Sequence, residues 1–411
     1  MFGKRIDYIR KMGISAVAIL TLGLLTACGQ NQSINTNIEV TDTISRVEND
    51  VVVSDEKKDE LLDSEDIKKD TTKDSKDSIQ TEELKEMFGD KCIVEQTFEV
   101  ELSEYSEKVY FVPFSSTEEN GEFTMEIFQD GKVLTTIQAY VPEVLVNEEF
   151  SSLDAVSFWD VNFDGNTDIV SIQTYGNTSF AAVYYGFSAD AEESERYFLS
   201  QEQLSENITS QVGTLTIPEI KNFLSDGKKN GSFSSYKEAY KAVSKLCEQE
   251  NLDEKKYDLI YFDEDDTPEL VAGVDGYYRS MYTYHDGTVY ALMNQWSYGA
   301  GGNAGYEYSP RRNSLRNYNN DYAGVILYTT YMTINERYSL ETVATIKTLN
   351  FDDVNGNEVP DEGEEGSVGN YSVSYMNGAE VTEEDYAQYD QGGYEYIEVT
   401  MHLDDLKSEL E

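Results

Sequence analysis

Cysteine, histidine and tryptophan are scarce in this chain of 411 residues, which contains three, two and two of them. Three cysteines are too few for a disulfide framework. Two histidines argue against His-rich zinc sites and leave little room for a Ser-His-Asp hydrolase. Basic residues are also few, since 31 Lys and Arg face 79 Asp and Glu and the formal net charge is −48. We therefore expect no nucleic-acid partner, because phosphates need a basic protein face.

The N-terminus carries the features of an export signal. Its first eleven residues hold four basic residues and one acidic residue, and residues 12–25 form an uncharged apolar run. That run is shorter than the roughly 20 residues of a membrane-spanning helix, and its length is typical of a signal-peptide core. The segment ends in Leu25-Thr26-Ala27-Cys28, which resembles the lipobox of bacterial lipoproteins. The resemblance implies that residues 1–27 are a lipoprotein signal peptide, cleaved before Cys28.

Cys28 is accordingly the expected lipidation site. The lipobox resemblance implies that its thiol is acylated, for example with palmitate, and stable anchoring takes more than one lipid chain. We therefore expect the protein at the cell membrane, anchored by lipid on the extracytoplasmic face. The alternative is an ordinary secretory signal in which Cys28 stands by chance.

Residues 28–85 are predicted to form a disordered, lipid-anchored tether. From residue 30 to residue 79 the sequence has no aromatic residue and no glycine, and it mixes Asp, Glu and Lys with Ser, Thr and Asn. Such a stretch cannot bury enough apolar surface to offset the entropy lost on ordering. A random coil of about 50 residues spans roughly 40 Å and would hold folded domains off the membrane. A short amphipathic helix is expected over Glu82–Phe88, ended by Gly89.

Residues 86–215 are predicted to form a β-rich domain. Apolar and acidic residues alternate over residues 98–102, and apolar residues recur at every second position over 123–127, which is the period of a half-buried strand. Asp130-Gly131 is typical of a two-residue hairpin turn. Further strands are predicted over Val133–Ala139, Val156–Trp159, Ile169–Gln173 and Ala181–Phe187.

Residues 216–411 are predicted to form an α+β domain. Helices are expected over Pro218–Leu224 and Tyr236–Glu250, the second opened by a capping box of Ser235 and Glu238. Thr382 opens another short helix in the same way. Strands are predicted over Tyr257–Tyr261, Glu269–Val274, Met281–Tyr284, Val289–Met293, Tyr306–Tyr308, Gly324–Thr333, Thr342–Leu349 and Tyr394–Met401. The expected fold class is α+β and β-rich, with two antiparallel-sheet domains joined by a short helical segment.

Two cysteines lie in these folded regions. Cys247 falls on the apolar stripe of the second predicted helix, so we interpret it as a buried apolar residue rather than a nucleophile. Cys92 stands at the start of a predicted strand. The sequence leaves open whether the two pair.

The clearest motif is an acidic loop with the sequence Asp160-Val-Asn162-Phe-Asp164-Gly-Asn166-Thr-Asp168. Calcium binds six to eight oxygens, which calcium loops supply from positions 1, 3, 5, 7 and 9, with Gly at position 6. Side-chain oxygens stand here at positions 1, 3, 5 and 9, a backbone carbonyl is available at position 7, and Gly165 occupies position 6. Position 12 is Ser171 instead of a bidentate Glu, which favours a strand–loop–strand site over an EF-hand.

This loop resembles those of integrin-like repeats and of bacterial periplasmic proteins related to lysozyme inhibitors, which carry a similar Asp-x-Asn-Phe-Asp-Gly stretch. The resemblance covers only the loop and its flanking strands. It implies a structural Ca²⁺ ion rather than a particular family. The alternative interpretation is a solvated acidic turn without metal.

A second acidic loop aligns with the first. Asp263, Asp265 and Glu269 occupy its positions 3, 5 and 9, whereas Tyr261 and Asp266 depart from the pattern at positions 1 and 6. Together with residues 281–290, this stretch resembles a domain common in uncharacterised lipoproteins of gut Firmicutes. Metal binding and a relic turn stabilised by Pro268 are the two interpretations.

A third acidic loop also has ligand-type side chains at the spacing of a calcium loop. They are Asp353, Asn355, Asn357, Asp361 and Glu364, at positions 1, 3, 5, 9 and 12. Glu358 replaces the glycine at position 6, although Gly356 could provide the turn elsewhere. The sequence leaves its occupancy open.

No catalytic motif accompanies these loops. The glycine-rich stretch 299–305 does not open a helix, so it is interpreted as a turn rather than a phosphate-binding loop. His285 precedes the hairpin residues Asp286-Gly287 and is interpreted as a strand-end side chain, and His402 has no partner in view. We find no nucleophile elbow, HExxH or Walker motif, and therefore expect a protein that is not an enzyme.

The expected function is that of a calcium-stabilised binding or envelope-interaction module at the cell surface. Its 31 tyrosines favour strands, and any exposed row of them would suit a cell-wall, glycan or protein ligand. One alternative is an inhibitor of a cell-wall hydrolase of the lysozyme type, since an acidic protein would complement a basic enzyme. Another is a glycan-acting hydrolase with a carboxylate pair.

Overall fold

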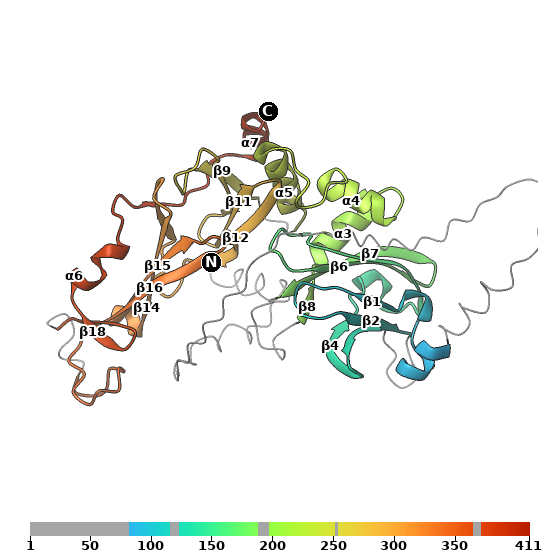
Figure 1. The fold of residues 1–411 in the computed structure, drawn as a ribbon, viewed down its shortest axis with the longest axis horizontal. Helices are drawn as coiled ribbons and strands as arrows, with labels where there is room; N and C mark the ends of the chain where they lie inside the picture. The colour runs from blue at the N-terminus through green and yellow to red at the C-terminus, as the bar shows by residue number, and fades with distance from the viewer. Residues whose placement is uncertain (1–81, 116–122, 188–196, 251–253, 365–370) are drawn as a thin grey trace, which may run out of the picture. The chain divides into compact units, whose positions relative to one another are not determined.

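The computed structural model describes residues 82–115, 123–187, 197–250, 254–364 and 371–411 (Figure 1). The predicted signal peptide, the lipidation site Cys28 and the tether up to residue 81 lie outside these ranges. The predicted short helix is present over residues 82–88, and the Gly89 amide donates to the Lys85 carbonyl at 2.8 Å. Within the described residues, no helix is both long enough and apolar enough to span a membrane.

The described part of the chain is β-rich, with four antiparallel sheets and few helices, which confirms the predicted fold class. Asp130 and Gly131 both have positive φ and form the predicted hairpin turn in the first sheet. The strands of that sheet, in spatial order, are β1 (Phe98–Val100), β2 (Val109–Phe114), β3 (Thr124–Gln129) and β4 (Lys132–Gln138).

The second sheet is covered on both faces. Its strands, in spatial order, are β5 (Phe150–Trp159), β6 (Asp168–Tyr175), β7 (Thr178–Phe187) and β8 (Tyr197–Ser200). Successive side chains of a strand point to opposite faces. Ile169 and Tyr184 accordingly belong to the apolar cluster shared with the first sheet, whereas Val170 and Val183 belong to a cluster shared with helices. This double burial holds the loop between β5 and β6 on a rigid support.

Three helices supply the other side of that cluster, namely α3 (Glu202–Gln211), α4 (Ile217–Ser225) and α5 (Tyr236–Glu250). Helix α5 has the predicted bounds, and the Ser235 hydroxyl accepts from the Glu238 amide at 3.3 Å. The return bond of the capping box goes to a different residue, because the Glu238 carboxylate accepts from the Ser234 amide at 2.8 Å. Cys247 is buried on α5, Cys92 is buried elsewhere, and both are free thiols.

Helix α5 also packs against a third sheet. Tyr240 of α5 joins Leu270 and Tyr282 of this sheet in one apolar cluster. The strands, in spatial order, are β12 (Thr288–Ser297), β11 (Tyr278–His285), β10 (Glu269–Val274) and β9 (Lys256–Ile260). The opposite face of the third sheet packs on the fourth sheet through residues such as Met281 and Leu315.

The fourth sheet has seven strands in the order β18-β17-β16-β15-β14-β13-β19. Their bounds are β13 (Tyr306–Ser309), β14 (Ser314–Asp321), β15 (Ile326–Ile334), β16 (Leu340–Leu349), β17 (Val373–Met376), β18 (Ala379–Val381) and β19 (Glu395–Tyr396). Thr382 and Asp385 form the predicted capping box of the short helix α6 (Glu383–Tyr386). Helix α7 (Leu403–Glu409) ends the chain.

The prediction of a strand over Tyr394–Met401 is wrong for most of these residues. Ile397 and Val399 are buried as the alternation implies. This segment, however, passes from one sheet to another and pairs briefly with each. Its Ile397 amide donates to the Tyr306 carbonyl of the fourth sheet at 2.8 Å, and Met401 bridges to Tyr257 of the third. Only residues 395–396 therefore form regular strand.

Candidate functional site

The first acidic loop connects β5 to β6 and is held in a tight turn by its own side chains. The Asp164 amide donates to Asp160 Oδ1 and to Asn162 Oδ1, both at 3.1 Å. The Asn166 amide donates to Asp164 Oδ1 at 2.9 Å. These bonds bring the side chains at positions 1, 3 and 5 to one side of the turn. Gly165 has φ +86°, the left-handed conformation that position 6 requires.

Asp168 has a different role in this loop. Its side chain is fully buried, with 0% exposure. Oδ2 accepts the amides of Val161 at 2.6 Å and Asn162 at 3.3 Å, and Oδ1 accepts the amide of Gly186 in β7 at 2.9 Å. Asp168 thus closes the loop through three backbone amides, one of them in β7. The Asp160 oxygens accept the loop amides of Asp164 and Gly165, and the Asp164 oxygens accept the Asn166 amide and the Asn162 side chain.

The carboxylates of this loop crowd one another away from bulk water. Burial, with the adjacent Asp164 carboxylate adding to it, raises the pKa of Asp160 to about 7. Burial also raises the pKa of Asp164 and holds that of Asp168 well above its ordinary value. A divalent cation among these groups would favour their ionised forms and remove the repulsion. The loop therefore gathers buried carboxyl groups whose ionised charge a cation could offset.

The loop also contacts the third sheet. The Phe163 carbonyl accepts the amide of Ala291 in the edge strand β12 at 2.8 Å. Asn230, from the connection between α4 and α5, donates from Nδ2 to Asp160 Oδ2 at 3.1 Å and to the Val289 carbonyl at 2.9 Å. Its Oδ1 accepts the Val289 amide at 2.8 Å. Sequence reasoning missed Asn230, because no local pattern links it to a loop 70 residues earlier.

The second acidic loop, between β9 and β10, repeats this scaffold. The Phe262 amide donates to Glu269 Oε2 at 2.8 Å, as the Val161 amide does to Asp168. The amides of Asp265 and Thr267 donate to Asp263 Oδ1 at 3.0 Å and Asp265 Oδ1 at 2.7 Å. The two loops therefore share these hydrogen bonds, with Glu269 as the closing acid. Their backbones differ, because Phe163 and Gly165 have positive φ and the aligned residues of the second loop do not.

Glu269 is buried, and both of its carboxylate oxygens accept hydrogen bonds from the protein. Its Oε1 accepts the Thr283 hydroxyl at 3.1 Å. Burial, with Asp263 adding to it, raises the pKa of Glu269 to about 8. The structure instead brings Asp263 and Asp265 together with His285, with one ligand-type atom of each lying within 4.8 Å of the others. Sequence reasoning placed His285 correctly at a strand end but did not connect it with this loop.

The third acidic loop follows β16 and is more exposed. Asp353 Oδ1 accepts the amides of Gly356 at 2.9 Å and Asn357 at 3.2 Å. Glu364 accepts the amide of Val354 at 2.9 Å and that of Asp361 at 3.1 Å, and so closes the loop from position 12. Asn355 Nδ2 and Asn357 Nδ2 each donate to Asp361 Oδ2 at 2.8 Å. Gly356 and Glu358 both have positive φ, so the turn is spread over two positions.

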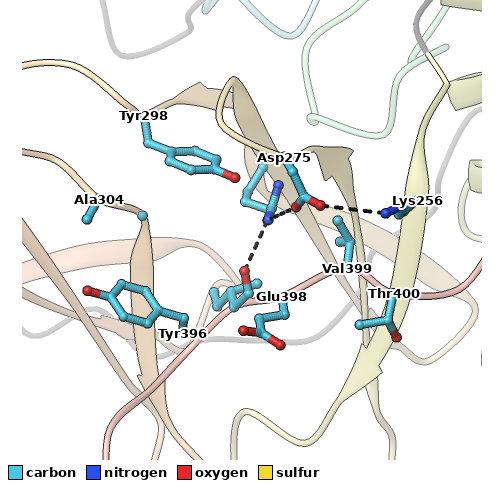
Figure 2. A pocket seen from close by; sticks show the side chains of 11 residues that line it. Lys256, Asp275, Tyr298, Ala304, Tyr396, Glu398, Val399 and Thr400 are labelled. Atoms are coloured by element: carbon cyan, nitrogen blue, oxygen red, sulfur yellow. Dashed lines mark hydrogen bonds and ion pairs between the residues drawn. The ribbon is translucent and has the colours of Figure 1, made fainter.

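A cavity of about 640 Å³ lies beside the third and fourth sheets (Figure 2). Arg279, only 4% exposed, lines it and donates to the Ile397 carbonyl at 3.0 Å and to Asp275 Oδ1 at 2.7 Å. Lys256 Nζ lies 3.7 Å from Asp275 Oδ2. Figure 2 shows Tyr298 and Tyr396 at one side and Lys256 at the other.

The cavity therefore combines two aromatic rings with charge-balanced polar groups. Several other tyrosines pack inside the protein, among them Tyr184, Tyr185 and Tyr282. Among the described residues, no strand therefore presents a row of exposed tyrosines to a ligand.

Comparison with models of protein families found no match, and a search of curated proteins found none either.

Proposed function

We propose that this chain is anchored by lipid at the extracytoplasmic face of the membrane and that calcium stabilises its fold. It binds a ligand without catalysing a reaction. Cys28 supplies the anchor and Ca²⁺ in the loop of Asp160, Asn162 and Asp164 supports the fold. The observation that carries the proposal is the conformation of this loop, in which ligand-type side chains converge at a point that contacts both the second and the third sheet.

The setting suits weak calcium binding. Extracellular calcium modules bind with dissociation constants of roughly 10⁻⁴–10⁻³ M. At a free calcium concentration ten times the dissociation constant, one site stabilises the folded state by about 1.4 kcal/mol. Because the loop contacts β12, this stabilisation would extend to the arrangement of β9–β12 beside the helices.

The cavity lined by Arg279 is the proposed ligand site, and its chemistry fits a neutral glycan. The C–H face of a sugar ring stacks on aromatic rings such as those of Tyr298 and Tyr396, and its hydroxyls pair with carboxylate and ammonium groups. Lys256 and Asp275 supply such groups, and Glu398 lies beside them. A cell-wall polysaccharide is a glycan that a protein tethered at this membrane face would meet.

A co-sedimentation experiment tests this proposal. The full-length chain in detergent is mixed with insoluble cell-wall glycan, in millimolar calcium and again in excess EGTA. Retention in the pellet that weakens in EGTA is the expected result. Absence from the pellet under both conditions would remove the glycan assignment. No specific structural observation favours the hydrolase-inhibitor alternative, which stays a prediction.

A further inference from the structure

Asp263, Asp265 and His285 meet at one end of the third sheet. The loop between β9 and β10 carries the two aspartates, and His285 is the last residue of β11 before the hairpin turn to β12. Because β9, β10 and β11 are adjacent antiparallel strands, this loop and this hairpin lie at the same sheet end. His285 Nδ1 is 4.0 Å from Asp265 Oδ2.

The imidazole is held in this orientation by groups outside the trio. Its ring stacks on Tyr338, with ring centroids 3.8 Å apart and planes 15° from parallel. His285 Nε2 lies 3.2 Å from the Thr283 hydroxyl, which donates to Glu269 Oε1 at 3.1 Å. Thr283 thus links the imidazole to the buried Glu269. The stacked Tyr338 and this side chain leave Nδ1 directed toward Asp265.

We propose that Asp263, Asp265 and His285 bind a transition-metal ion of the zinc type, at a site separate from the calcium loop of Asp160. Imidazole nitrogen suits zinc, whereas calcium takes oxygen ligands almost exclusively. Tyr261 replaces the first calcium ligand, so this loop offers one oxygen side chain fewer than the first loop, and the nearby side chain is a histidine nitrogen donor. Zinc needs only three protein ligands and a water.

The trio is close to zinc geometry and is not already neutralised. Tetrahedral zinc with bonds of about 2.0–2.2 Å places ligand atoms roughly 3.4 Å apart, so rotations of the partly exposed aspartates would bring the three atoms to that spacing. Within the described residues, neither aspartate carboxylate pairs with Lys or Arg, because the nearby Arg311 is directed to Asp266 and to the Asp265 carbonyl.

Histidine-selective NMR on the full-length chain in detergent tests this inference. The sequence has only two histidines, so the ring signal of His285 reports on the site and that of His402, exposed beside Glu254, is an internal control. One equivalent of Zn²⁺ should shift the His285 signal and leave His402 in place, and millimolar Ca²⁺ should not reverse the shift. An unmoved His285, equal movement of both signals, or reversal by calcium would overturn the proposal.

Calorimetric titration with zinc compares the zinc affinity of matched variants. His285→Phe keeps an aromatic ring against Tyr338, and Asp263→Asn is nearly isosteric, so both should fold. Each should weaken zinc binding at least tenfold, whereas Asp164→Asn in the first loop should leave it unchanged. Equal zinc affinity in wild type and both site variants would contradict the assignment. Loss of zinc binding in Asp164→Asn as well would place the ion in the first loop instead.

Discussion

The carboxylate of Asp168 accepts the amide of Val161, seven residues earlier, at 2.6 Å. Glu269 accepts the amide of Phe262 across the same interval in the second loop, and Glu364 accepts that of Val354 in the third. In each loop one acidic side chain thus accepts a backbone amide from the start of the loop and holds its two ends together. This relationship distinguishes the acids that close the loops from Asp160 and Asp164, whose hydrogen bonds stay within the turn or go to Asn230.

Asp168→Asn and Asp164→Asn should therefore have opposite signatures. In Asp168→Asn, the new side-chain NH₂ group would face a backbone N–H donor where a carboxylate oxygen now accepts. This variant should therefore lose about 1–3 kcal/mol of stability even in EGTA. Asp164→Asn removes a repelling carboxylate and keeps an oxygen that can accept the Asn166 amide, so only the contact of Oδ2 with Asn162 Nδ2 is lost. Its stability in EGTA should be unchanged or higher, and its response to calcium should be lost. Urea unfolding with and without calcium distinguishes the two, and similar losses in EGTA would refute the distinction.

The stability of the calcium-free protein should fall as the pH rises. Burial raises the pKa of Asp160 from 3.8 to about 7 and that of Glu269 from 4.5 to about 8. Between the ordinary and the raised values the folded state binds more protons than the unfolded chain, so stability is greatest at the acid side and is lost on the way to pH 8. Calcium should flatten this dependence for Asp160. Urea midpoints measured in EGTA from about pH 5 to pH 8 check the slope, and a rising profile would contradict it.

Asn230→Ala should weaken both the loop and its contact with β12. The substitution removes the donor to Asp160 and leaves the Val289 amide and carbonyl without this partner, at a cost of about 1–3 kcal/mol. Ser232→Ala in the same connection is the control, because its hydroxyl bonds only within the turn to Lys229. Amide hydrogen exchange should show faster exchange at Val289 and Ala291 in the first variant alone. Unchanged protection there would show that Asn230 does not join the two sheets.

Tyr396→Ala should reduce glycan retention without reducing stability. Tyr396 is 48% exposed at the cavity, and Tyr322, 54% exposed outside it, is the matched control. Loss of one stacking ring should cost about 1 kcal/mol, or roughly fivefold in affinity. Co-sedimentation at several protein concentrations measures this difference. Equal losses in Tyr396→Ala and Tyr322→Ala would show that the cavity is not the binding site.

Local patterns predicted the parts of this structure that depend on residues close in sequence. Helix α5, the Asp130-Gly131 turn and the conformations of the acidic loops all arise from contacts within a few residues, which spacing reveals. Asn230 and His285 reach their loops through tertiary packing, and no local spacing signals such contacts. Strand β14 escaped prediction because its sequence is largely polar, although it lies inside a sheet.

The central claim is that calcium at Asp160, Asn162 and Asp164 stabilises the fold, and thermal unfolding of the full-length chain tests it most directly. The protein is melted in excess EGTA and again after millimolar calcium is restored. The melting temperature should fall in EGTA by about 3 °C or more and recover with calcium, and Asp164→Asn should show no such response. An identical melt in EGTA and in calcium would contradict the claim.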